Sequence, residues 1–157
     1  MKPVRGIVLV EDDEGHAVLF IKQLRRRGIQ NPIHHFVTGT DALAFLETPL
    51  AAAEIPLLIV LDINLPDMPG TEVLARISVH PTVKAIPVVM LTSSDDQADA
   101  ELSFALGCRH YMIKPLQVEQ FVDVCSKLGY PLSIESAFTF DTATGGLQVP
   151  TPTDRET

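Results

Sequence analysis

Short apolar runs alternate along the chain with segments in which apolar residues recur at helical spacing. Three runs, Ile7–Val10, Leu57–Leu61 and Pro87–Leu91, have the length of strands and contain no polar position. Such runs are typical of strands that are covered on both faces. Two weaker strands are predicted at Ile33–Val37 and Tyr111–Ile113.

A helix-length segment follows each predicted strand. The first carries an apolar face at i, i+3, i+4 and i+7, which consists of Ala17, Phe20, Ile21 and Leu24. Strands that alternate with helices are typical of right-handed βαβ units. The pattern therefore predicts an α/β fold with one parallel sheet.

The length, charge and cysteine content of the chain exclude several classes of function. A chain of 157 residues is long enough for one domain with a sizeable core and too short for two ordinary domains. Its formal charge of −8 argues against direct nucleic-acid binding, which needs clustered Lys and Arg. No apolar run reaches the length of a membrane span, so no membrane contact is expected. Cys108 and Cys125 lie in apolar segments without metal-ligand spacing, which favours buried free thiols and a reducing cytoplasmic location.

Polar side chains follow four of the predicted strands. Asp12 and Asp13 follow the first strand, Asp62 the third, Thr92 the fourth and Lys114 the fifth. Ligands of open parallel sheets bind beyond the carboxyl ends of the strands, so these five residues are expected to converge. Three carboxylates in one place repel each other unless a cation lies among them. Mg²⁺, which prefers oxygen ligands, is the predicted cation.

The segments "VEDD", "LDINLPDMPG", "MLTSS" and "YMIKP" stand in this order at those strand ends. Together they resemble the receiver domain of bacterial two-component response regulators, and the chain is most similar to single-domain receivers, including those paired with phytochrome-type kinases. The resemblance implies a flavodoxin-like (βα)5 doubly wound sheet with strand order 2-1-3-4-5. It would cover residues 4–130, and residues 131–157 would form a partly disordered tail without an output domain.

The resemblance also implies roles for single residues. Asp62 would be the phosphoacceptor, and Asp13 would hold Mg²⁺ directly, with Asp12 acting largely through water. The carboxylate of Asp62 and the backbone carbonyl of Asn64 would complete the protein ligands. Lys114 would neutralise the phosphoryl charge, and its bond to the following proline is expected to be cis.

A switch is implied as well. Thr92 would move to the phosphoryl oxygens, and Tyr111 would rotate inward from an outward position. Asn64 and Ser94 would tune hydrolysis of the acyl phosphate. The donor would be a sensor histidine kinase or a phosphotransfer protein, and the changed surface would include the fourth helix, fifth strand and fifth helix, which also offer a face for a homodimer. The chain would be a signalling phosphoacceptor, not an enzyme that acts on other molecules.

Other interpretations of the same residues remain open at this point. Asp12 and Asp13 could simply favour a helix start, and Asp62 could form a turn. A Mg-dependent phosphohydrolase of the haloacid dehalogenase type also uses a strand-end Asp, but it expects a second Asp where this chain has Asn64. A flavodoxin-like cofactor binder would need a Ser/Thr/Gly-rich phosphate loop in place of the acidic "EDDEGH".

Overall fold

The computed structural model describes residues 4–93, 97–133, 139–141 and 146–148. Its main sheet has five parallel strands in the order β2-β1-β3-β4-β5, which confirms the predicted α/β topology. Two further short strands, β6 and β7, pair antiparallel in a separate sheet. The strand bounds are β1 Ile7–Val10, β2 Ile33–Phe36, β3 Leu58–Asp62, β4 Val88–Thr92, β5 His110–Ile113, β6 Thr139–Asp141 and β7 Gly146–Gln148.

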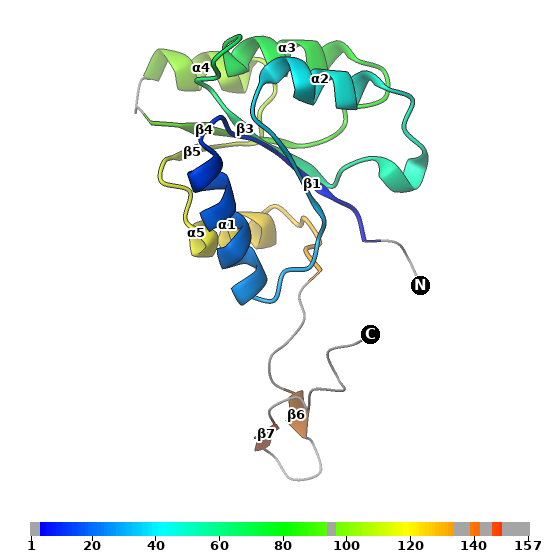
Figure 1. Ribbon diagram of the computed structural model, residues 1–157, viewed down its shortest axis with the longest axis vertical. Coiled ribbons are helices and arrows are strands. Elements are labelled where there is room, and N and C mark those ends of the chain that lie inside the picture. The colour runs from blue at the N-terminus through cyan, green and yellow to red at the C-terminus, as the bar shows by residue number, and fades with distance from the viewer. Residues whose placement is uncertain (1–3, 94–96, 134–138, 142–145, 149–157) are drawn as a thin grey trace.

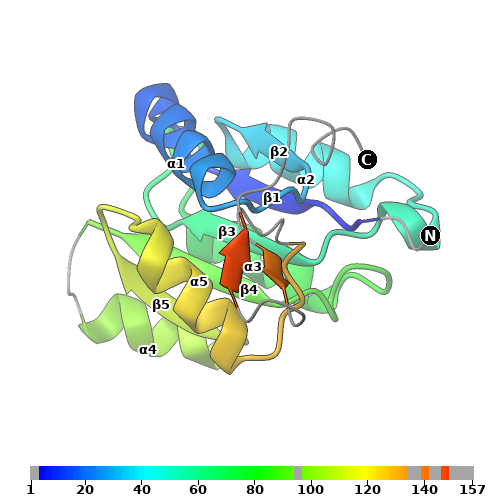
Figure 2. The ribbon, with the colours of Figure 1, turned by 90° about the horizontal axis from the view of Figure 1, so that it is seen from below.

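Helices cover both faces of the main sheet. In Figure 1 the helices α2, α3 and α4 lie on one side of the strands, and α1 and α5 lie on the other. Figure 2 looks onto the sheet from the α1–α5 side. The helix bounds are α1 Glu14–Arg26, α2 Gly39–Glu47, α3 Gly70–Val79, α4 Gln97–Ala105 and α5 Val118–Lys127, with a 3₁₀ turn at Ala52–Glu54.

The strand side chains alternate between two apolar cores. Val8, Val10 and Leu61 belong to the core beneath α2 and α3, whereas Leu9 and Val60 belong to the core beneath α1 and α5. Every residue of β1, β3 and β4 is buried. The continuous apolar runs in the sequence therefore reflect strands that are covered on both faces.

Strand register aligns the residues at the carboxyl edge of the sheet. Val10 pairs with Leu61, so the residue after β1 stands beside Asp62, the last residue of β3. At the other side Thr92 pairs with Ile113, and the backbone N–H of the next residue, Lys114, donates to the Thr92 carbonyl at 2.7 Å. This register places Glu11, the candidate phosphoacceptor Asp62 and Lys114 at the carboxyl edge of the sheet.

Ordered packing extends beyond α5. The N–H of Ser133 donates to Asn31 Oδ1 at 2.7 Å, and the Ser133 carbonyl accepts from the N–H of Gln30 at 2.7 Å. Tyr130 and Leu132 pack against the α1–α5 core. The described part of the chain contains no helix long and apolar enough to cross a membrane.

Candidate functional site

Three carboxylates gather at the carboxyl edge of the sheet. One oxygen each from Glu11, Asp12 and Asp62 lies within 4.8 Å of the others. Glu11 and Asp62 are only 3% and 2% exposed, whereas Asp12 is exposed. The cluster therefore has a buried floor and an open side.

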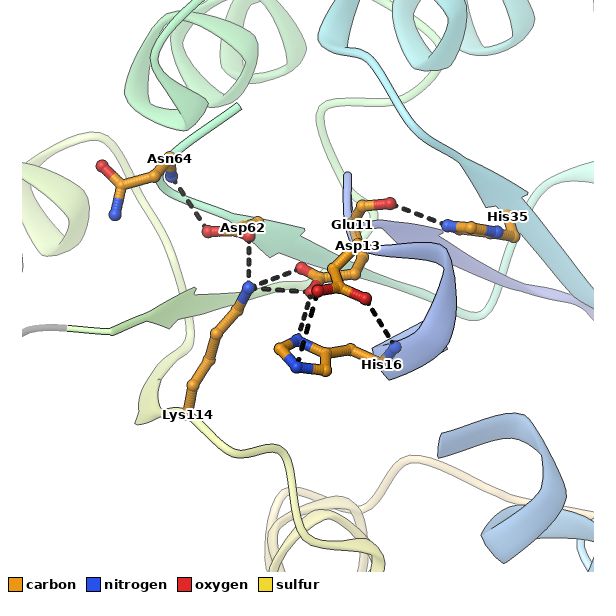
Figure 3. Close-up of polar contacts among 7 residues, drawn as sticks. All are labelled: Glu11, Asp13, His16, His35, Asp62, Asn64 and Lys114. Atoms are coloured by element: carbon orange, nitrogen blue, oxygen red, sulfur yellow. Dashed lines mark hydrogen bonds and ion pairs between the residues drawn. The ribbon is translucent and has the colours of Figure 1, made fainter. Parts of the chain in front are cut away.

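Lys114 reaches this cluster from the end of β5. Its Nζ donates to Asp62 Oδ2 at 2.5 Å and to Glu11 Oε1 and Oε2 at 2.9 and 2.7 Å (Figure 3). The Lys114–Pro115 peptide bond is cis, as the family resemblance implied. Lys114 thus lies between the phosphoacceptor candidate and a second buried acid.

The charges of the cluster do not balance. Burial, together with the neighbouring Asp62, raises the pKa of Glu11 to about 7, although Lys114 opposes the shift. Burial also works against the Lys114 ammonium, but its bonds to Asp62 and Glu11 outweigh this and raise its pKa. When all three acids are ionised, one ammonium faces three carboxylates. A hard divalent cation such as Mg²⁺ fits this donor set, because it takes oxygen ligands and supplies the missing positive charge.

Asp13 lies outside the cluster and caps helix α1. Its Oδ1 accepts from the N–H of His16 at 3.0 Å, and its extended backbone precedes the first helical residue. The same backbone bond lowers the pKa of Asp13. The structure therefore places Glu11 and Asp12, rather than Asp12 and Asp13, beside Asp62, and the expected direct contact of Asp13 with a metal has no support in this geometry.

Glu11 is the site residue that the sequence reasoning missed. Its N–H donates to the Phe36 carbonyl at 3.0 Å, and its own carbonyl accepts from His35 Nε2 at 2.8 Å. His16 Nδ1 lies 3.2 Å from Glu11 Oε1. The available signal was alternation: Glu11 follows Leu9 by two positions, so it continues the row of side chains on the α1–α5 side of the sheet beyond the end of β1.

Asn64 approaches Asp62 through its backbone. The Asn64 N–H donates to Asp62 Oδ1 at 2.9 Å, which leaves Oδ2 to Lys114. The Asn64 side chain is exposed. A side chain at Gly70 would lie 2.8 Å from Ile63 Cα and against the Asp62 carbonyl, so only glycine permits this close return of the chain.

The predicted switch residues lie on β4 and β5. Thr92 is fully buried at the end of β4. Tyr111 is half-buried, and its hydroxyl is buried without a hydrogen-bond partner among the described residues. Its ring centroid lies 6.4 Å from that of Phe104 on α4. The buried hydroxyl differs from the outward starting position that the resemblance implied for Tyr111. Ser94 falls outside the described residues.

The fold agrees with comparisons to known proteins. The family model for the response regulator receiver domain matches residues 7–126. The chain belongs to this family. The receiver is 37% identical over 114 residues to the response regulator Rcp1 of Synechocystis sp., and the match covers 71% of this chain and 78% of Rcp1.

Solved structures of similar receivers give the same result. The Mn²⁺-bound form of Rcp1 superimposes with a TM-score of 0.68 at 30% identity, covering 84% of this receiver and 99% of that chain. The phosphorylated cyanobacterial phytochrome response regulator RcpA gives a TM-score of 0.67 at 33% identity, covering 80% and 91%. This receiver is thus similar to single-domain response regulators, phytochrome response regulators among them.

Proposed function

We propose that this receiver accepts one phosphoryl group on Asp62 from the phosphohistidine of a sensor histidine kinase or phosphotransfer protein, in a reaction that depends on Mg²⁺. The observation that carries the proposal is the placement of Asp62. Its carboxylate is buried at the end of β3, bonded to Lys114, and within 4.8 Å of carboxylate oxygens from Glu11 and Asp12. A purely structural ion pair would not need two further acids beside it.

The receiver's own residues would perform distinct parts of the transfer. Asp12, Asp62, Glu11 and the Asn64 carbonyl would hold Mg²⁺, which when bound supplies positive charge that offsets the repulsion between a carboxylate and an anionic phosphoryl group. An Asp62 oxygen attacks phosphorus while the bond from phosphorus to the donor imidazole nitrogen breaks, and its electron pair remains on that nitrogen. The Asn64 N–H fixes the rotation of the Asp62 carboxylate. The Lys114 ammonium would move with the developing charge to the phosphoryl oxygens.

Phosphorylation of Asp62 would change the surface of the receiver through residues on β4 and β5. Thr92 would bond to the new phosphoryl oxygens, Tyr111 would keep its hydroxyl buried beside α4, and Asn64 and Ser94 would tune hydrolysis. On the surface, Phe104 and Ile113 are each 52% exposed, and Leu102 is 47% exposed. An apolar surface on α4 and β5 supports the proposal that the α4-β5-α5 face binds a protein partner or a second copy of the receiver.

The proposal is tested by intact mass after incubation with acetyl phosphate, with and without Mg²⁺. Wild type is expected to gain one phosphoryl group only when Mg²⁺ is present, and Asp62→Asn is expected to gain none. Asp41→Asn is a matched control, because Asp41 is an exposed acid on α2 and is not one of the three clustered acids. Phosphorylation of the Asp62→Asn variant at the wild-type rate would contradict the assignment. An adduct that forms equally well in EDTA would contradict the role of Mg²⁺.

A further inference from the structure

We propose that Asp67 is a positioning residue for the phosphoacceptor: it fastens the β3–α3 loop, residues 63–69, to the N-terminus of α2 and so holds Asn64 and Asp62 in the geometry that binds the metal. The inference rests on the proposed function and adds a residue outside the acidic cluster. Asp67 lies three residues beyond Asn64, in the same loop.

The fastening consists of three hydrogen bonds to two residues. Asp67 Oδ1 accepts from the Gly39 N–H at 2.9 Å, and Oδ2 accepts from the N–H and Oγ1 of Thr40 at 2.8 and 2.5 Å. The hydrogen bond from the Thr40 hydroxyl lowers the pKa of Asp67 most. Burial opposes this shift, but the bonds from the Gly39 and Thr40 N–H groups add to it, and the pKa falls to about 2. The ionised carboxylate is therefore the form that bridges loop and helix.

Close packing at Gly39 brings the loop and the helix together independently of these bonds. A Cβ at Gly39 would lie 2.8 Å from Cγ of Met68, in the loop, and 2.8 Å from Cγ2 of Val73, on α3. The absence of a side chain lets the loop approach the first turn of α2. Loop and helix therefore meet through a fitted contact as well as through the Asp67 carboxylate.

The loop transmits this contact to the site because it is closed on itself. Asn64 and Pro69 form an antiparallel bridge, and the Gly70 N–H donates to the Ile63 carbonyl at 2.8 Å. A closed loop moves as a unit, so a tilt at Asp67 displaces Asn64. Because the Asn64 N–H holds Asp62 Oδ1, the same tilt turns the phosphoacceptor.

A second link between the same elements offers a matched control. Glu47, at the end of α2, accepts from Arg76 on α3 at 2.7 Å. This exposed ion pair also ties α2 to the elements that follow β3, but it lies at the far end of the helix. If the Asp67 contact served only stability, its removal should affect metal affinity no more than removal of the Glu47–Arg76 ion pair does.

The experiment measures Mn²⁺ affinity by electron paramagnetic resonance of the free ion, with thermal unfolding in EDTA recorded beside it. Asp67→Ala is expected to weaken Mn²⁺ binding about tenfold, in the range found when supporting partners of metal ligands are removed. Asp67→Asn keeps an acceptor for Gly39 and should lose less. Glu47→Gln should leave the affinity unchanged.

The outcomes separate the possibilities. Wild-type affinity in a folded Asp67→Ala variant, or an equal loss in Glu47→Gln, would overturn the positioning role and leave the metal site intact. If Asp67→Ala does not fold, Gly39→Ala probes the same contact from the helix side and should also weaken Mn²⁺ binding; unchanged affinity there would count against the proposal. Wild type that binds no Mn²⁺ would overturn the proposed metal site and this inference together.

Discussion

Replacing the acids after β1 one at a time distinguishes the cap from the metal site. In Asp13→Ala the N–H of His16 loses its acceptor at 3.0 Å, and α1 loses its N-cap. Loss of such a cap costs about 1 kcal/mol of folding stability. For a domain of this size the melting temperature should fall by roughly 2–4 °C. Mn²⁺ affinity should stay near the wild-type value, because Asp13 is not part of the cluster.

Asp12→Ala should give the opposite result. Asp12 is exposed and its removal relieves repulsion among three acids, so stability in EDTA should hold or rise. A carboxylate about 4 Å from a unit charge contributes roughly 4 kcal/mol at an effective dielectric constant of 20. Water replaces the lost ligand and recovers much of this, but a loss of at least about 1.4 kcal/mol, or tenfold in affinity, should remain.

Calorimetric titration with Mn²⁺ measures the affinity directly, which suits a chain that contains no Trp. Asp13→Asn is the matched variant, because Asn caps helices as well as Asp does. It should restore the melting temperature that Asp13→Ala loses. If Asp13→Ala and Asp13→Asn both weaken Mn²⁺ binding as much as Asp12→Ala does, Asp13 is a direct ligand and the assignment drawn from the structure is wrong.

Two further predictions concern the floor of the site. Because folding raises the pKa of Glu11 from 4.5 to about 7, the folded state binds more protons between these values, and the stability of the metal-free receiver should fall as pH rises through this window. Glu11→Gln should remove up to about 3 kcal/mol of this change in unfolding free energy, measured by denaturant titration at several pH values. If the stability of wild type and of Glu11→Gln varied with pH in the same way, the prediction would be refuted. Gly70→Ala places a methyl group against the backbone of Asp62 and Ile63 and should destabilise the domain by about 1–3 kcal/mol, measured by urea unfolding. An unchanged urea midpoint for Gly70→Ala would contradict this prediction and show that the backbone around Gly70 can move to accommodate a methyl group.

The fold could be predicted from the sequence because continuous apolar runs, typical of buried strands, alternate along the chain with apolar residues at helical spacing. The strands β1, β3 and β4 are apolar up to the last residue of β3 and β4, as expected for strands between two helical layers. The first helix shows its buried face through Ala17, Phe20 and Leu24. Since parallel strands align their carboxyl ends, the same pattern also predicts where Asp62 and Lys114 meet.

The details of the site depend on contacts that the sequence does not display. The contact between Asp67 and the first turn of α2 joins residues 27 and 28 positions apart, and no local pattern indicates it. The choice between neighbouring acids depends on register, because a shift of one residue exchanges the faces of a strand. Val10 pairs with Leu61, so the acid beside Asp62 is Glu11.

Four consecutive acids after a buried strand therefore do not act as one charged patch. Glu11 turns inward and binds Lys114, and Asp12 completes the cluster from the exposed side. Asp13 accepts from the N–H of His16 in the first turn of α1, and Glu14 lies in the same turn, where the helix dipole favours a negative charge. Only the first two have a carboxylate oxygen in the cluster with Asp62, so the acidity of this segment overstates the number of ligands that it offers a metal. The metal dependence of the site should consequently follow substitutions at Glu11 and Asp12 and be insensitive to Glu14.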